Sequence, residues 1–200
     1  ETRTYGSENH KYKVALFDFG YKRNIRNELV NRGCEVIVVP ADTTAEQIKE
    51  IAPDGIMFSN GPGDPSENTE VIKNIREIAQ LGIPIFGICL GHQLMALAHG
   101  ATTQKLKYGH RGANQPVIDK ALGKTFVTSQ NHGYAVVGES MDPEIGEVSH
   151  INANDGTCEG MRYKNINAFT VQFHPEAHGG PQDTAYLFDE FIEMIKKEMH

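Results

Sequence analysis

The chain has 200 residues, 39% of them hydrophobic and 22% charged, which suits one large folded domain with its own core. Its 19 basic and 26 acidic residues give a formal net charge of −7, which argues against nucleic acid as the main partner. The longest apolar runs have the length of strands, so we expect no membrane-spanning helix. Three cysteines without C-x-x-C spacing predict neither a disulfide framework nor a zinc ribbon, and they favour the reducing cytoplasm.

The first half of the chain alternates between short apolar runs and helical patterns. Residues 1–12 are polar and aperiodic, and we expect a tail or linker there. Four apolar runs follow, each succeeded by a helical pattern, and this order predicts an α/β fold with an open, mostly parallel sheet flanked by helices. Strands are expected at Lys13–Phe19, Cys34–Val39, Gly55–Ser59 and Ile83–Ile88, and helices at Lys22–Arg32, Thr44–Ile51, Val71–Ala79 and Cys89–Ala98.

After Gly100 the pattern changes to short β-like segments, so we expect a more antiparallel β portion in the second half. These segments are 101–107, 124–128, 134–137, 145–150, 158–163 and 168–173. The Asn154-Asp155-Gly156 sequence predicts a hairpin turn. An amphipathic pattern over Leu187–Ile195 predicts a final helix.

A cysteine lies where the fourth predicted strand meets its helix. Gly87-Ile88-Cys89-Leu90-Gly91 has the form of a nucleophile elbow, in which a sharp turn leaves no room for side chains two residues before and after the nucleophile. Free N–H groups at a helix N-terminus stabilise a thiolate, and the turn would present it at the carboxyl edge of the sheet. The alternative is an inert buried cysteine beside two packing glycines.

A histidine and a glutamate follow the last predicted strand. A thiolate nucleophile needs a base, usually histidine, and the base needs a partner that orients its ring. His174-Pro175-Glu176 supplies both, although the same three residues also suit an ordinary surface turn. Cys89 and His174 both come directly after strands of the predicted sheet, so contact between them is plausible.

A glycine-rich loop completes the pattern. Gly61-Pro62-Gly63-Asp64-Pro65 follows the third predicted strand, and glycines let backbone N–H groups approach a ligand closely. With the N–H of Leu90, this loop is suited to stabilise the oxyanion of a tetrahedral intermediate. Without the other motifs, this loop would be interpreted as an ordinary turn before a helix.

Together these motifs resemble the class I (triad) glutamine amidotransferases. The motifs are Ser59–Pro65, Gly87–Gln93 and His174–Glu176, and the resemblance covers residues 13–195. We therefore expect residues 13–200 to form one glutaminase domain. Three further stretches are similar to the small, glutaminase subunit of carbamoyl-phosphate synthetase: Asp18–Asn24, Lys107–Pro116 and Ser129–Val136.

The resemblance implies an activity and a site. Cys89 would attack L-glutamine, His174 would act as acid and base, Glu176 would orient His174, and a glutamyl thioester would form and be hydrolysed. Glutamine contacts are implied at Gly61, Gly63, Leu90, Gln93, Asn131, Gly133 and Tyr134. Ammonia would pass to a carbamoyl-phosphate synthetase large subunit, or a fused synthetase region, for pyrimidine or arginine synthesis. ATP, magnesium and bicarbonate are expected only on that partner, so this chain is expected to need no cofactor.

The family's small subunit carries a further domain before its glutaminase domain. The start at Glu1 and the short polar segment that follows lead us to expect that this N-terminal domain is missing here, and that residues 1–12 are the connecting segment.

Three other functions stay open. The chain is alternatively the glutaminase of another amidotransferase, such as one serving anthranilate or GMP synthesis, which should lack the last two stretches in this form. It is alternatively a Cys-His hydrolase of peptides or γ-glutamyl conjugates. A non-catalytic scaffold is disfavoured, because Cys89, His174 and Glu176 are all intact.

The remaining cysteines, histidines and basic residues have simpler interpretations. We expect Cys34 and Cys158 to be core thiols, and His92 and His99 to be packing or surface groups. A secondary role for His132 stays open, in what we expect to be a loop. The nine histidines show no metal-binding spacing, so no metal site is expected. A basic strip is expected to be a solvated face or a partner contact; it consists of Lys105, Lys107, His110 and Arg111.

Overall fold

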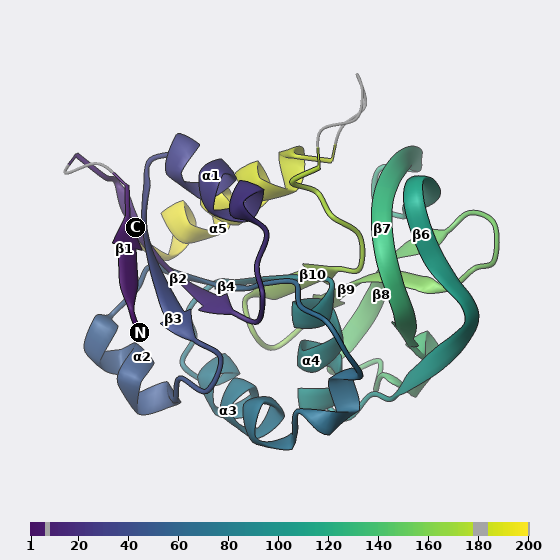
Figure 1. Ribbon diagram of the computed structural model, residues 1–200, viewed down its shortest axis with the longest axis horizontal. Coiled ribbons are helices and arrows are strands. Elements are labelled where there is room, and N and C mark those ends of the chain that lie inside the picture. The colour runs from purple at the N-terminus through teal and green to yellow at the C-terminus, as the bar shows by residue number, and fades with distance from the viewer. Residues whose placement is uncertain (7–8, 178–183, 200) are drawn as a thin grey trace.

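The computed structural model describes residues 1–6, 9–177 and 184–199 (Figure 1). Within them, ten strands form one sheet in the order β1-β3-β2-β4-β5-β10-β9-β8-β6-β7. The strands are β1 (Arg3–Tyr5), β2 (Tyr12–Asp18), β3 (Cys34–Pro40), β4 (Gly55–Phe58), β5 (Ile85–Ile88), β6 (Thr103–Asp119), β7 (Lys124–Val136), β8 (Gly146–Asn152), β9 (Cys158–Tyr163) and β10 (Ala168–Val171). The helices are α1 (Arg23–Asn31), α2 (Ala45–Ile51), α3 (Thr69–Ala79), α4 (Leu90–Ala98) and α5 (Tyr186–Met199), with 3₁₀ turns η1 (Pro65–Glu67) and η2 (Gly138–Ser140).

The first part of the sheet is parallel, which confirms the predicted fold class. Strands β3, β2, β4, β5 and β10 are parallel neighbours, and each of the first four is followed by a helix. Arg3–Tyr5 lies in the segment that we expected to be a tail or linker, and it forms an antiparallel edge strand on β3 instead. Three residues give no periodicity, so this strand has no signal in the sequence.

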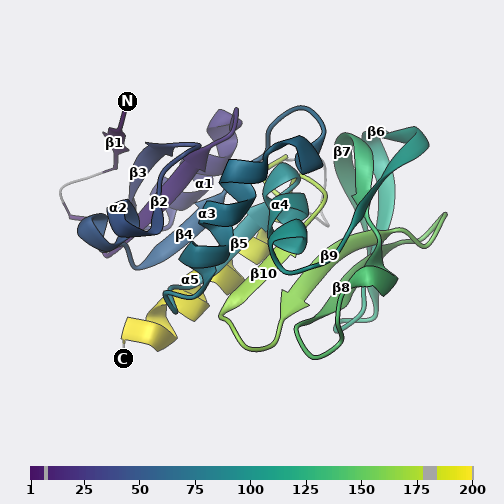
Figure 2. The same cartoon turned by 90° about the horizontal axis from the view of Figure 1, so that it is seen from below.

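Helices cover both faces of the parallel strands. In Figure 1, α1 and α5 lie above the sheet and α2, α3 and α4 lie below it, and Figure 2 shows the lower three from beneath. One apolar cluster joins the sheet to α1 and α5 through side chains such as Leu29 and Phe188, and the other joins it to α2, α3 and α4 through Ile48, Ile75 and Leu94. Strands buried on both faces explain the near-continuous apolar runs of the sequence.

The second part of the sheet is antiparallel, as predicted, but its strands are longer than expected. β9, β8, β6 and β7 continue the sheet from β10, with a turn over 153–155 between β8 and β9. Residues 108–119 and 129–133, which we did not assign to strands, belong to the β6–β7 pair, so Asn131–Gly133 is strand and not loop. The register of this pair shifts at Lys105/His110 and Gly112/Gln115, and such bulges interrupt the alternation by which strands are recognised. No helix among the described residues is long and apolar enough to cross a membrane.

Candidate active site

Cys89 lies at a sharp turn between a strand and a helix. β5 ends at Ile88, α4 begins at Leu90, and Cys89 between them has φ of 53° and ψ of −103°. A side chain at positive φ costs about 1–3 kcal/mol and persists only where the surroundings impose it. Here the N–H of Cys89 donates to the carbonyl oxygen of Val171 at 2.8 Å, which ties the turn to the end of β10.

The two glycines around Cys89 meet the steric need that the sequence suggested. A Cβ atom on Gly91 would lie 2.2 Å from the carbonyl oxygen of Phe58, and one on Gly87 would lie 2.9 Å from the Thr170 side chain. The N–H of Gly91 also donates to the carbonyl oxygen of Ser59 at 3.1 Å. Strand β4 therefore packs directly on the first turn of α4, and only glycine fits there.

His174 and Glu176 come to the same edge of the sheet. β10 lies parallel beside β5, with Val171 opposite Ile88, so the chain that follows each strand leaves the sheet at the same end. Nδ1 of His174 lies 2.7 Å from Oε1 of Glu176, and the two side chains are 4% and 1% exposed. Since Nδ1 faces the carboxylate, Nε2 is the nitrogen left for Cys89.

The electrostatics of His174 follow from these neighbours. Burial lowers the pKa of His174. Hydrogen bonds with Cys89 and Glu176 and the charges of both have the larger, opposite effect and raise it to about 9. The imidazolium is thus the favoured form at neutral pH. A group that must protonate a leaving amine has to hold a proton at working pH, so this shift fits the role of an acid.

Gln172 is a neighbour of Cys89 that the sequence analysis missed. It is fully buried, and its Nε2 donates to Sγ of Cys89 at 3.5 Å. Its Oε1 accepts from Nε2 of Gln93 at 2.9 Å, and the same Gln93 nitrogen donates to the carbonyl oxygen of Tyr134 at 2.9 Å. The available signal was a carboxamide between two apolar residues, Val171 and Phe173, next to the proposed base.

Several predicted glutamine contacts lie around this turn. Leu90 is the first residue of α4, where helix N–H groups lack a carbonyl one turn earlier. A Cβ atom on Gly61 would lie 2.2 Å from the carbonyl oxygen of Phe19 and 2.8 Å from the Leu90 side chain, so the glycine loop packs against the elbow. Gly63 has φ of 94° and open space around its Cβ position. No contact in the described structure ties Gly63 to Cys89.

The remaining predicted contacts lie on β7, the strand that reaches His174. The N–H of His174 donates to the carbonyl oxygen of Ser129 at 3.0 Å, which places this strand next to His174. Asn131 is exposed, and its Oδ1 accepts from Nη1 of Arg111 at 2.8 Å. Gly133 and Tyr134 are half-buried, and the Tyr134 carbonyl is linked to Gln93 as described above.

A second set of titratable groups lies behind β7. The ligand atoms of His110, His132 and Glu159 lie within 4.8 Å of one another, the only such group of three found among the described residues. Sequence spacing gave no sign of this group, because its three side chains come from three different strands, β6, β7 and β9. Both nitrogens of His132 are already engaged, one at 2.7 Å from the Tyr134 carbonyl oxygen and one at 2.7 Å from Oε1 of Gln130. These contacts describe a hydrogen-bonded ionic cluster.

The other cysteines and histidines behave largely as expected. Cys34 and Cys158 are buried, and burial raises the pKa of each thiol to about 12, so neither is reactive. His92 is fully buried, with Nδ1 2.7 Å from Oγ1 of Thr170, which confirms a packing role. In the basic strip the lysines and Arg111 are exposed, but His110 is buried, so the prediction of a solvated face is wrong for that residue.

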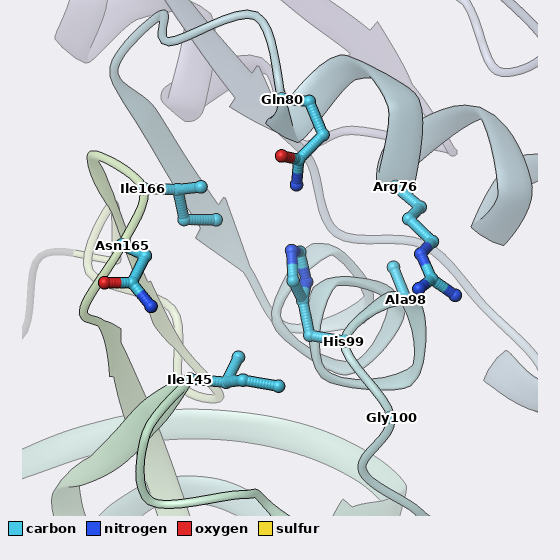
Figure 3. Close-up of a pocket in the computed structure, with 8 residues that line it drawn as sticks. All are labelled: Arg76, Gln80, Ala98, His99, Gly100, Ile145, Asn165 and Ile166. Atoms are coloured by element: carbon cyan, nitrogen blue, oxygen red, sulfur yellow. The ribbon is translucent and has the colours of Figure 1, made fainter.

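A separate cavity of about 410 Å³ lies at the other end of α4 (Figure 3). Gln80 and His99 point toward one another across it, and Ile145 and Asn165 border it. His99 follows the last residue of α4, whereas Cys89 precedes its first. None of the described residues that line the cavity belongs to the Cys89–His174–Glu176 group, so we place the chemistry at the elbow.

Known proteins resemble this chain over nearly its whole length. The model of the family "Glutamine amidotransferase class-I" matches residues 15–194. Proteins named carbamoyl phosphate synthase small chain, from Bacillus cereus and Staphylococcus epidermidis, are 55% and 57% identical over 192 and 193 residues. Each alignment covers 96% of this chain and 52% of the relative, so the chain spans about half the length of these curated relatives.

A solved structure shares the fold. The crystal structure of a protein from Thermoplasma acidophilum, provisionally assigned as one of the subunits of GMP synthase, superposes with a TM-score of 0.82. It is 21% identical, and the superposition covers 95% of this chain and 96% of that one. At this identity the likeness extends to the fold alone.

Proposed function

The chain belongs to the class-I glutamine amidotransferase family, and we propose that it hydrolyses L-glutamine to glutamate and ammonia at Cys89. The observation that carries the proposal is the continuous buried contact from Cys89 through His174 to Glu176 at the edge of the parallel sheet. A thiol, an imidazole and a carboxylate in this order are the parts of nucleophilic acyl transfer.

The reaction proceeds in two steps. The Cys89 thiolate attacks the side-chain carbonyl carbon of glutamine, and the imidazolium of His174 gives its proton to the departing nitrogen, which leaves as ammonia. A glutamyl thioester remains on Cys89. Neutral His174 then takes a proton from water, which attacks the thioester and releases glutamate, and the thiolate–imidazolium pair returns. Glu176 orients the ring and stabilises its positive charge throughout.

The negative oxygen of each tetrahedral intermediate needs donors. The N–H of Leu90, at the start of α4, and the backbone of the Gly61 loop that packs against it are suited to supply them. We assign the glutamine contacts to Gly61, Gly63, Leu90, Gln93, Asn131, Gly133 and Tyr134. Both Nε2 hydrogens of Gln93 are used within the protein, so its contact with substrate is through Oε1.

The ammonia is proposed to serve carbamoyl phosphate synthesis in the cytoplasm. Support comes from the relatives named carbamoyl phosphate synthase small chain, which match nearly all of this chain. The partner would be the synthetase large subunit or a fused synthetase region, and ATP, magnesium and bicarbonate would act there. The chemistry assigned to this chain needs only the triad and water, so we propose no cofactor for it. The other half of the relatives' length would belong to an N-terminal domain outside residues 1–200.

The test is glutamine hydrolysis by the protein in its full-length form, with and without the synthetase partner, followed as release of glutamate and ammonia. Cys89→Ser keeps the size of the side chain but removes the thiolate, so we expect hydrolysis to be abolished and the fold to be retained. Cys158→Ser serves as the matched control, since that thiol is buried in the other apolar cluster, which does not include Cys89. Hydrolysis by Cys89→Ser at the wild-type rate would refute the assignment of the nucleophile.

A further inference from the structure

Four titratable groups gather in the layer behind the glutamine-contacting strand. His110 on β6 lies between two carboxylates: its Nε2 is 2.7 Å from Oδ2 of Asp155, and its Nδ1 is 3.3 Å from Oε1 of Glu159. Glu159, on β9, is fully buried, and His110 and His132 are each 7% exposed. Nothing in the chemistry of the triad uses these groups, yet a buried charge is costly unless something compensates for it.

Hydrogen bonds connect Glu159 to the strand that contacts substrate. Nε2 of Gln130 donates to Oε2 of Glu159 at 2.5 Å and to Oγ1 of Thr128 at 3.1 Å, and Oε1 of Gln130 lies 2.7 Å from Nε2 of His132. Nδ1 of His132 lies 2.7 Å from the carbonyl oxygen of Tyr134. These contacts form a chain from Glu159 through Gln130 and His132 to the backbone of Tyr134.

The donors and acceptors in this chain do not balance when every group has its ordinary protonation. Carbonyl oxygens only accept, so His132 needs a hydrogen on each ring nitrogen, whereas a neutral imidazole has one. Turning the Gln130 amide end for end satisfies His132 but brings the amide oxygen against Glu159, which then needs a hydrogen itself. The turned oxygen also faces Oγ1 of Thr128, whose hydrogen must then move from the carbonyl oxygen of Gln115 to Gln130. In both orientations the chain lacks one hydrogen, and in both a single added proton completes it.

The charges of these groups also indicate that one proton is missing. When both are ionised, the two carboxylates raise the pKa of His110 to about 9, against the opposing effect of burial. The 2.7 Å contact of its Nε2 with Asp155 persists when Glu159 takes up a proton, so we assign His110 as cationic at neutral pH. With Asp155 and an ionised Glu159, this leaves a net charge of −1 in a buried cluster, and one further proton makes it neutral. Burial raises the pKa of Glu159, although His110 and Gln130 oppose it, and burial together with the charges of His110, His174 and Arg111 lowers that of His132 to about 4. Both directions favour the carboxyl as the site of the proton.

We propose that Glu159, Gln130 and His132 share one buried proton, and that this protonated chain holds the glutamine-contacting segment of β7 in position. The inference rests on the proposed function of the site. These three residues touch no reacting atom and are positioning residues. Their effect reaches the nucleophile through the Tyr134 carbonyl, which also accepts from Gln93, because Gln93 binds Gln172 and Gln172 donates to Cys89.

The test is calorimetric binding of L-glutamine to the full-length protein carrying Cys89→Ser, so that no turnover occurs. In this background, Glu159→Gln supplies permanent amide hydrogens in place of the shared proton, and Glu159→Met has similar size but supplies none. We expect Glu159→Gln to bind at pH 7 within about threefold of the parent, and Glu159→Met to bind tenfold or more weakly, as expected for a lost buried hydrogen bond. Glu147→Gln, an exposed glutamate on β8, is the matched control and should leave the affinity unchanged.

The pH dependence gives a second, independent readout. Raising the pH removes the shared proton from the parent but not the amide hydrogens of Glu159→Gln. The ratio of the parent's Kd to that of Glu159→Gln should therefore rise between pH 7 and 9.5, by up to tenfold per pH unit once the proton is released. A ratio that stays constant over this range contradicts the proposal.

Two results at pH 7 would also overturn it. If Glu159→Gln binds as weakly as Glu159→Met, Glu159 acts as an anion and no proton is shared. If Glu159→Met binds like the parent, the chain does not position the site. Should the Cys89→Ser parent fail to bind glutamine at any pH, the proposed function fails instead, so the two failures are distinguishable.

Discussion

Replacing Glu176 with glutamine tests whether this carboxylate acts through the charge of His174. The substitution keeps the size of the side chain and an oxygen that accepts from Nδ1, but it removes the negative charge 2.7 Å from the ring. His174 must carry a proton when ammonia leaves, so activity should fall as the pH rises through the pKa of His174. We expect this alkaline limb near pH 9 in the wild type and at lower pH in Glu176→Gln.

The size of the change follows from the contact. Both side chains are buried, so solvent screens the pair little, and a hydrogen bond to a charged group is worth about 1.5–3 kcal/mol. Since about 1.4 kcal/mol corresponds to one pKa unit, loss of the charge should lower the pKa of His174 by about one to two. The alkaline limb then moves from about 9 toward 7 to 8. The activity of Glu176→Gln relative to the wild type should therefore be roughly three- to tenfold lower at pH 8.5 than at pH 7.

The assay is kcat/KM for ammonia release, measured from pH 6 to 10 at glutamine concentrations well below KM, because this ratio reports the pKa values of the free enzyme. Glu77→Gln on α3 is a control that changes an exposed carboxylate. The control should follow the wild-type profile. The reasoning is refuted if Glu176→Gln lowers the rate by the same factor at every pH and leaves the alkaline limb where it was, because Glu176 would then act without changing the charge of His174.

Three further substitutions separate stability from chemistry. Gly91→Ala should lower the free energy of unfolding by about 3 kcal/mol, since its Cβ would lie 2.2 Å from a backbone oxygen, whereas Gly82→Ala, with open space and φ of 79°, should cost about 1–2 kcal/mol; equal melting temperatures for the two would contradict the elbow packing. Cys158→Ala should cost about 1 kcal/mol of stability and leave glutamine hydrolysis intact, and a folded but inactive variant would show that this thiol has a role in the reaction.

The parts of the fold that were predictable are those with local signals. Apolar runs buried on both faces gave the parallel strands, and the helix expected from Thr44 begins there with a reciprocal cap between Thr44 and Gln47. The meeting of Cys89, His174 and Glu176 was predictable because each follows a strand and has a distinctive neighbour pattern. Parallel strands end at one edge of the sheet, so residues 85 positions apart in sequence meet without any local sign of it.

The parts that were missed depend on long-range pairing. His110 and Glu159 come from strands far apart in the chain, and each alone resembles a surface residue of an acidic protein. β7 alternates regularly between buried and more exposed residues from Phe126 to His132, but the inward side chains of Thr128, Gln130 and His132 are polar, so this part of the sequence shows no apolar alternation. Burial of a polar side chain is decided by what packs over it, and that information lies in other segments of the sequence.

The central claim is that Cys89 is the nucleophile of a site shaped for glutamine. The most direct measurement is mass spectrometry of the full-length protein after incubation with 6-diazo-5-oxo-norleucine, a glutamine-shaped alkylating agent. Our account predicts that a single adduct forms on Cys89, that excess glutamine blocks it, and that Cys34 and Cys158 stay unmodified. Labelling of another residue in preference to Cys89, or labelling of Cys89 that glutamine does not prevent, would contradict it.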